Sequence, residues 1–305
     1  MSSVVRKLAR LRNTVDTLKT FQPPQHVVAG LQYETIMGSE AYGVSSGNSD
    51  RDIYGFSIPT KDMVFPHLAG EIVGFGRTAK RFEQWEQHHV KHGDYVYDFS
   101  IYSLVRYFTL LMENNPNIID SIFTPARCVL YSTQLAEHVR SNRRVFLHKG
   151  SWHRFKGYAY AQLHKMKIKS PQPGSKRADD VKQHGFDRKF AYHIVRLIGE
   201  AEQILADGNI DLERDRERLK AIRAGEMSEE NIEQFFTDKE KVLERLYHES
   251  ALPYRPDQEA IKKLLLECLE MHFGSLTEAE IRLPGKVENA LRTIVKTANE
   301  ALGET

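Results

Sequence analysis

The chain contains very little cysteine and no long run of hydrophobic residues. Cys128 and Cys268 are the only 2 cysteines among 305 residues. They are too few and too far apart for a disulfide framework or a zinc site, so we expect two reduced packing residues. The basic residues near the N-terminus are followed by no uninterrupted apolar stretch, so neither a signal peptide nor a membrane span is predicted. We therefore expect a cytoplasmic protein that has no membrane partner.

Acidic residues are missing from one long segment. The net charge of +2 says nothing by itself about nucleic acid, but no Asp or Glu occurs from His138 to Ala178, where basic and aromatic residues are interleaved. Such a surface suits both backbone phosphates and stacked, unpaired bases; the alternative is a solvated helix whose aromatic side chains pack inward. We predict contact with phosphate, and the candidate RNA-binding residues are Arg143, Arg144, Tyr158, Lys165 and Lys167.

The segment from Gly38 to Gly43 has the form of a phosphate-binding turn. The apolar pair Ile36-Met37 leads into Gly38, whose missing side chain lets the backbone approach a phosphate, and Ser39 adds a hydroxyl donor. A lone Gly-Ser turn is usually only a turn. The interpretation therefore depends on the residues that come after the turn.

Two aspartates follow after a short polar loop. In Asp50-Arg51-Asp52-Ile53, the alternation of an extended strand would place both carboxylates on one face and the other two side chains on the opposite face. Hard oxygen ligands on one face suit Mg²⁺, which binds carboxylates together with substrate phosphates. Two such ions about 3.5–4 Å apart would activate an attacking hydroxyl and stabilise a leaving pyrophosphate. This chemistry requires a third carboxylate.

These residues resemble a known family. The string Gly-Ser-x-Ala-Tyr-Gly…Ser-Asp-x-Asp-x-x-Gly, which ends at Gly55, is similar to the signature of the DNA polymerase β-like nucleotidyltransferase superfamily and of its branch associated with RNA ligase. The likeness spans roughly residues 30–225 and continues in Tyr97–Ile101, Asn115–Ile119, Phe155–Tyr158 and Lys189–Arg196.

The resemblance implies a role for each matching residue. Asp98, which is flanked by aromatic and apolar residues, would be the third metal ligand, and it would also help to deprotonate the acceptor. Asp50, Asp52 and Asp98 would then be the catalytic, metal-binding set, holding two Mg²⁺ ions for which Mn²⁺ is an expected substitute. The nearby Asp94 lies beside Gly93 in a polar stretch and is the weaker candidate for the third ligand.

Nucleotide binding is predicted for a second group of residues. Gly38 and Ser39 would bind the β- and γ-phosphates, and Tyr42 and Ser49 are further candidates within the motif. Later in the chain, three polar residues fall at i, i+4 and i+7 of a predicted helix and would share one face. Their positive charge and hydrogen-bonding capacity would serve an NTP triphosphate; these residues are Lys189, His193 and Arg196.

The pattern predicts an α+β fold with two domains. The first part shows an amphipathic helix near 4–20 and strands near 30–37, 51–58 and 95–101. Helical spacing then runs from Tyr102 to Met112, and Pro116 lies in the first turn of another short helix. After about residue 150 the pattern is almost wholly helical. We expect a polymerase β-like catalytic domain, a mixed sheet with flanking helices, at 1–145, and a helical domain that closes the nucleotide cleft at 146–305.

A group of three histidines offers a different metal site. His88, His89 and His92 lie close together in the sequence and could in principle bind zinc or another transition metal. No Cys lies near them, and the aspartate motif already supplies hard oxygen ligands. We therefore predict solvated histidines.

Together these features predict an Mg²⁺-dependent nucleotidyltransferase. It would move a nucleoside monophosphate from an NTP to an acceptor hydroxyl and release pyrophosphate. The basic segment and the resemblance favour an RNA end as the acceptor and an RNA ligase as a functional partner. Two alternatives stay open: transfer to a protein or small molecule, as in toxin-like or antibiotic-modifying members of the superfamily, and a catalytically silent nucleic-acid-binding protein. Three intact aspartates argue against the silent protein.

Overall fold

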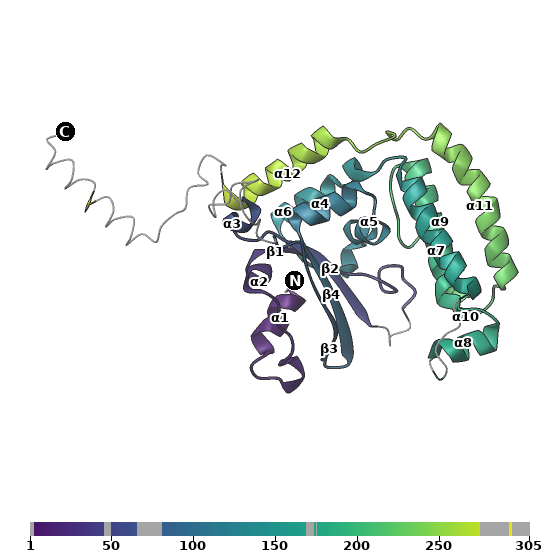
Figure 1. Ribbon diagram of the computed structural model, residues 1–305, viewed down its shortest axis with the longest axis horizontal. Helices are drawn as coiled ribbons and strands as arrows, with labels where there is room; N and C mark the ends of the chain where they lie inside the picture. The colour runs from purple at the N-terminus through teal and green to yellow at the C-terminus, as the bar shows by residue number, and fades with distance from the viewer. Residues whose placement is uncertain are drawn as a thin grey trace, which may run out of the picture.

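The computed structural model describes residues 3–45, 50–65, 81–168, 174, 176–274 and 293–294. Its N-terminal half is built on a five-stranded sheet of order β3-β4-β2-β1-β5. β2 and β4 are parallel, and the other neighbouring strands are antiparallel. The mixed sheet with flanking helices confirms the predicted α+β class (Figure 1). The strands are β1 (Leu31–Ile36), β2 (Arg51–Ser57), β3 (Gln84–His92), β4 (Tyr95–Ser103) and β5 (Val129–Ser132).

The strands predicted near 30–37, 51–58 and 95–101 are confirmed, whereas the single helix predicted over 4–20 was wrong. Helix α1 covers Val4–Leu11, and only a short 3₁₀ turn, Asp16–Leu18, follows it. The Thr14 hydroxyl donates a hydrogen bond to the Leu11 carbonyl at 3.0 Å, and this local side-chain bond competes with continuation of the helix. β3 was not predicted, because its sequence is rich in His and Gln and lacks regular alternation.

One face of the sheet is covered by the N-terminal segment. The ring of Phe21 lies 5.2 Å from Phe99 of β4 and 5.6 Å from Trp85 of β3. Glu34 of β1 is buried and accepts the backbone N–H groups of Val4 at 3.1 Å and Val5 at 2.9 Å. A carboxylate at the first turn of a helix satisfies otherwise unpaired donors, so this contact fixes α1 to the sheet.

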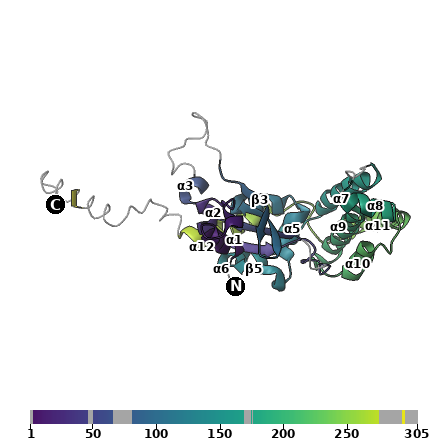
Figure 2. The ribbon, with the colours of Figure 1, turned by 90° about the horizontal axis from the view of Figure 1, so that it is seen from below.

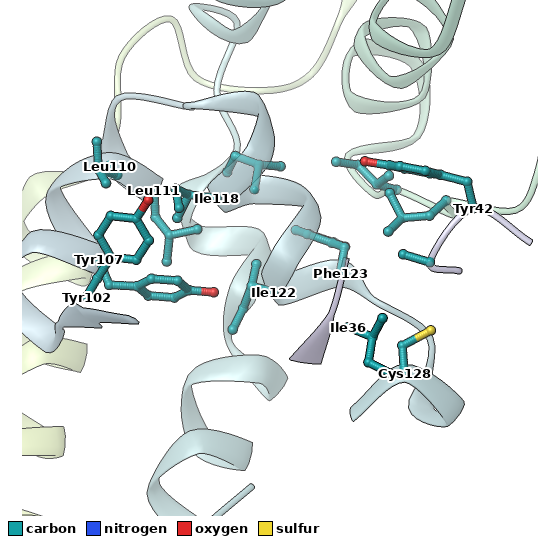
Figure 3. Packing of buried hydrophobic residues seen from close by; sticks show 14 of the residues in the cluster. Ile36, Tyr42, Tyr102, Tyr107, Leu110, Leu111, Ile118, Ile122, Phe123 and Cys128 are labelled. Atoms are coloured by element: carbon teal, nitrogen blue, oxygen red, sulfur yellow. The ribbon is translucent and has the colours of Figure 1, made fainter. Parts of the chain in front are cut away.

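The other face is covered by α4 (Leu104–Met112) and α5 (Pro116–Phe123). The Phe56 ring of β2 lies 5.8 Å from Tyr33 of β1 and 4.9 Å from Tyr107 of α4. Figure 3 shows the buried residues of α4 beside Ile118 of α5, and Phe123 at the end of α5 near Ile36. Pro116 lies in the first turn of α5, as predicted, and Asn115 is the N-cap of this helix.

The C-terminal half is helical, as predicted. α9 packs against both α7 and α11, and these helices stand to one side of the sheet (Figures 1 and 2). α12 instead returns to pack on α4 and on α6 (Gln134–Ser141). The two-domain division at residue 145 therefore stays a prediction, with α12 contacting the N-terminal half. The helices are α7 (Ser151–Ile168), α8 (Lys176–His184), α9 (Arg188–Asp207), α10 (Arg216–Ala224), α11 (Glu229–Glu249) and α12 (Gln258–Phe273).

None of the helices in the described ranges has both the length and the apolar character needed to span a membrane.

Candidate active site

Asp52 and Asp98 lie directly beside each other on the two parallel strands. They are register partners, Asp52 on β2 and Asp98 on β4, and neighbouring strands are separated by about 4.8 Å. Register partners project from the same face of a sheet. Their side chains are half-buried. Two carboxylates that are far apart in the sequence are thus brought to one place by the β2–β4 pairing.

The environment of Asp52 disfavours the ionised form of its carboxyl group. Burial, followed by the negative charges of Asp98 and Asp50, raises the pKa of Asp52 from 3.8 to about 6, and the positive charge of Lys189 opposes the shift. Two nearby carboxylates without a counter-ion repel each other, and a bound divalent cation would remove that penalty. The donor set therefore fits a hard metal ion that prefers oxygen ligands.

Asp50 precedes β2 and is exposed. Its charge acts on Asp52, so it belongs to the same electrostatic cluster. In the described part of the chain, however, no three His, Cys, Asp or Glu side chains converge tightly enough to form a metal site by themselves. The assignment of all three aspartates as metal ligands stays a prediction.

Gly38 forms the turn that faces Asp52. Its φ is +69°, and a Cβ atom built on it would lie 2.6 Å from Asp52 Oδ2. The ladder between β1 and β2 continues to this point, because Met37 N–H donates to the Asp52 carbonyl at 2.7 Å. The half-buried Ser39 follows. Only glycine combines this left-handed conformation with so close an approach, so the predicted turn and the aspartate motif form one unit.

Lys189 approaches the carboxylates from the helical half. It lies in the first turn of α9, where the Asp187 side chain caps the helix by accepting its backbone N–H at 2.9 Å. Its side chain is exposed, and its charge lowers the pKa of Asp52 against the effect of burial. An exposed lysine whose charge reaches acidic residues is well suited to bind a phosphate.

Arg196 is placed differently from Lys189, although the two share a predicted helix face. Its side chain is only 6% exposed. It forms ion pairs with Asp120 of α5 and with Glu200, one turn further along α9. The Tyr42 hydroxyl accepts from Arg196 Nη1 at 2.7 Å and donates to Asp120 Oδ2 at 2.6 Å. We define Tyr42, Asp120, Arg196 and Glu200 as the buried network.

The buried network joins three parts of the chain that the sequence motifs mark: the turn after Gly38, the helix that follows Asn115, and α9. Two carboxyl groups share one guanidinium, and burial raises the pKa of both Asp120 and Glu200 against the opposing charge of Arg196. The structure therefore gives Arg196 and Tyr42 buried partners that hold the motif turn against α9. Their predicted contact with nucleotide is untested.

Asp120 was missed by sequence reasoning. Its signal was present, because Asp120 is the one charged residue of the apolar helix Pro116–Phe123, and a buried carboxylate requires a partner.

His193 lies between Lys189 and Arg196 on α9; it is half-buried, and its ring lies 5.3 Å from the Tyr192 ring. Ser49, the remaining nucleotide-binding candidate, lies outside the described residues.

Two further arginines hold the motif turn and were also not predicted. Arg127 Nη1 donates to the Glu40 carbonyl at 2.9 Å, and Arg223 Nη1 donates to the Val44 carbonyl at 2.7 Å. Arg51 Nε adds an ion pair to the Glu40 carboxylate at 3.0 Å. Every residue has a backbone carbonyl, so the sequence does not indicate which carbonyls these arginines bind. The turn is therefore fixed from both halves of the protein.

The acid-free segment acquires acidic partners when the chain folds. Lys167 of α7 pairs with Glu233 of α11 at 2.7 Å, and Lys156 pairs with Glu240. Arg143 is half-buried, with its guanidinium 4.9 Å from the centre of the Phe123 ring. These contacts neutralise or cover part of the predicted phosphate-binding surface.

Other members of the predicted RNA-binding set remain accessible. Arg144 and Lys165 are exposed. Tyr158 is 38% exposed, and its hydroxyl accepts a hydrogen bond from Asn115 at 3.3 Å. These three side chains are the accessible candidates that remain, and their contact with RNA stays a prediction.

Comparison with known proteins relates the motifs to a family. A family model described as "RNA repair pathway DNA polymerase beta family" matches residues 9–267. Among solved structures, a nucleotidyltransferase-like protein from Exiguobacterium sibiricum 255-15 is similar at 12% identity, over 86% of this chain and 73% of that chain, with a TM-score of 0.28. No curated protein matches the chain.

Proposed function

The chain belongs to the RNA repair pathway DNA polymerase beta family and is a nucleotidyltransferase, and from this premise we propose that it transfers a nucleoside monophosphate from an NTP to the hydroxyl of an RNA end. The family match confirms the resemblance that the motifs indicated. The single observation that supports the chemistry best is the pairing of Asp52 with Asp98 on β2 and β4.

The acidic residues would hold the metal ions. Polymerase β-like nucleotidyltransferases generally use divalent metals, and we propose Mg²⁺ held by Asp50, Asp52 and Asp98. When bound, such ions neutralise charge on the triphosphate and favour ionisation of the attacking hydroxyl. The raised pKa of Asp52 supports this assignment, because a site with crowded negative charge gains most from a cation.

The remaining residues would bind and orient the substrates. The turn at Gly38 and Ser39 would bind the β- and γ-phosphates through backbone N–H groups and a hydroxyl, and Lys189 would contact the triphosphate from α9. Asp98 would accept the proton of the acceptor hydroxyl. The acceptor oxygen then bonds to the α-phosphorus, the bond from that phosphorus to the oxygen bridging to the β-phosphorus breaks, and pyrophosphate leaves. Most of the rate would come from positioning and charge neutralisation.

RNA is the proposed acceptor for two reasons. The family description refers to an RNA repair pathway, and Arg144, Tyr158 and Lys165 form an accessible set with two cations and an aromatic ring. The ion pairs of Lys156 and Lys167 with α11 weaken the second reason. Transfer to a protein or small molecule therefore remains the competing proposal.

A labelling experiment separates these acceptors. The protein is incubated with each α-³²P-labelled NTP and Mg²⁺, with and without RNA, and the products are separated on gels. Label on RNA supports the proposal. Label on protein, or on a small molecule when one is supplied, would show that this molecule and not RNA is the acceptor. The reaction would still be transfer of a nucleoside monophosphate.

The RNA surface is tested by binding at increasing salt. Each phosphate contact with single-stranded RNA contributes a slope of about −0.7 to the log–log plot of affinity against salt. The double charge reversal Arg144→Glu with Lys165→Glu should flatten that slope. Reversal of the exposed Arg10, which lies on α1, is the control. An unchanged slope in the double variant would remove these residues from the RNA surface.

A further inference from the structure

Strand β3 contains an extra residue directly opposite Asp98. Gln87 pairs with Phe99 and Val90 pairs with Tyr97 on the antiparallel strand β4. Two residues of β3, His88 and His89, therefore stand against the single residue Asp98. This is a β-bulge, and bulges of this kind are common beside active sites, where they redirect groups of the strand.

The bulge contacts the Asp98 carboxylate through one oxygen atom. The backbone N–H of His89 donates to Asp98 Oδ1 at 2.7 Å, and His88 Nδ1 lies 3.7 Å from the same oxygen. No described residue donates a hydrogen bond to Oδ2. One oxygen of the carboxylate is thus fixed by protein, which leaves the other for a ligand.

His89 donates this hydrogen bond from an unusual backbone conformation. The φ of His89 is +57°, one of only two positive values among non-glycine residues in the described chain. This left-handed region is tolerated by glycine, and by asparagine or histidine better than by β-branched residues. The side chain of His89 is 81% exposed and its Nδ1 lies 3.9 Å from Asp98 Oδ1, so the shorter and better-defined contact is the one from the backbone.

We infer that the His88–His89 bulge positions Asp98 for metal binding, with the His89 backbone N–H as the group that fixes the carboxylate. This inference rests on the proposed metal role of Asp98. Hydrogen-bond partners of a ligating carboxylate set its orientation, and their loss typically reduces metal affinity or activity about 10–100-fold. His89 is then a positioning residue, whose side chain is dispensable and whose backbone conformation is not.

A substitution series at His89 separates the backbone from the side chain. His89→Gly and His89→Asn keep the N–H and tolerate a positive φ, whereas His89→Ala and His89→Val disfavour it increasingly. The readouts are Mn²⁺ binding to the protein alone, measured by the electron paramagnetic resonance signal of free Mn²⁺, the turnover number for NMP transfer, and the metal-free melting temperature. His88→Ala tests the neighbouring imidazole in the same assays.

The inference predicts an order of Mn²⁺ affinity. Gly and Asn variants should bind within about twofold of wild type, and the Val variant should bind at least about tenfold more weakly, with a parallel loss of turnover. If the Val variant does not fold, the comparison of Ala with Gly makes the same test. A purely structural role for the bulge would change the melting temperature without changing Mn²⁺ affinity in folded variants.

Two outcomes distinguish failure of the inference from failure of the proposed function. If Asp98→Asn abolishes Mn²⁺ binding but His89→Val, or His89→Ala where Val is unfolded, binds like wild type, the bulge does not position Asp98 and the inference is overturned. If Asp98→Asn itself keeps wild-type Mn²⁺ affinity and turnover, the metal role of Asp98 fails first and the inference fails with it.

Discussion

Gly38 and Asp52 stand so close that no side chain fits between them: a Cβ atom on Gly38 would lie 2.6 Å from Asp52 Oδ2. The turn proposed to bind phosphate and the carboxylate proposed to bind metal therefore share one surface. This contact explains physically why a glycine followed by Asp-x-Asp predicts a site when either motif alone does not.

The first prediction is that Gly38→Ala inactivates the enzyme. The substitution places a Cβ against the Asp52 carboxylate in a backbone with φ of +69°, and the left-handed conformation alone costs about 1–2 kcal/mol. We expect turnover for NMP transfer to fall by at least about tenfold, because a small displacement of the Asp52 carboxylate would misalign the reacting groups and lower the rate. Gly93→Ala is the matched control, since Gly93 has φ of +59° and nothing within 4 Å of its added Cβ. Equal turnover in the two variants would show that the clash with Asp52 has no effect.

The second prediction concerns the metal-free protein. The pKa of Asp52 is about 6 when folded, against an ordinary value of 3.8. The folded state therefore binds more protons than the unfolded state between these pH values, and stability falls as the pH rises through this window. Asp52→Asn should remove this loss and raise the free energy of unfolding at pH 7 by up to about 3 kcal/mol, from a shift of about 2 units. Urea denaturation at pH 4 and pH 7 measures it.

The control for that measurement is the divalent metal. Addition of Mg²⁺ should stabilise the wild type at pH 7 and should stabilise Asp52→Asn much less, because the variant has lost a ligand. A variant that is less stable than wild type at pH 7 without metal would contradict a raised pKa of Asp52 in the folded state.

The third prediction is a specific loss of NTP affinity in Lys189→Ala. Lys189 is exposed, and its charge reaches Asp52, so the variant should lose a phosphate contact and little stability. We expect the KM for NTP to rise at least about tenfold, the loss expected for a charge-assisted hydrogen bond of about 1.5–3 kcal/mol. Lys182→Ala, at another exposed lysine on the neighbouring helix α8, should keep the wild-type KM. Identical NTP dependence in both variants would make Lys189 a solvated residue.

The fourth prediction is that Arg196→Met strongly destabilises the fold. It leaves Asp120 and Glu200, which are 0% and 3% exposed, without their countercharge, and breaking a buried ion pair typically costs about 3–5 kcal/mol. The double variant Arg196→Met with Asp120→Asn should recover part of that loss. Denaturant unfolding measures both variants. If Arg196→Met lowers the free energy of unfolding by less than about 1 kcal/mol and reduces NTP affinity instead, Arg196 binds nucleotide as the sequence predicted.

Sequence and structure agree where the signal is local. Alternation along β2 and the aromatic flanks of Asp98 indicated two strands with acidic residues, and the structure makes Asp52 and Asp98 register partners. The helix that starts at Pro116 was equally visible, because its cap and its first-turn proline are adjacent in sequence. In these cases the residues that decide the structure lie within one turn or one strand.

The features that the sequence did not predict depend on partners that are distant in sequence. Arg196 looked available for phosphate because its countercharge, Asp120, is 76 residues away. The acid-free segment likewise looked unpaired because Glu233 and Glu240 are supplied by α11. A charge is exposed or neutralised only once the fold has brought the other elements beside it, so sequence could place the charges but not their pairing. The bulge at His88–His89 was hidden for the same reason, since it is defined by the register with β4.

The most direct test of the central claim is release of pyrophosphate coupled to NMP transfer in wild type, Asp52→Asn and Asp98→Asn under identical Mg²⁺, NTP and RNA concentrations. All three proteins are first shown to be folded by thermal melting. The account predicts stoichiometric pyrophosphate release and label transfer in the wild type, and a loss of at least about a hundredfold in each variant, because each removes a proposed metal ligand. Transfer by Asp52→Asn at more than a small fraction of the wild-type rate would contradict the account.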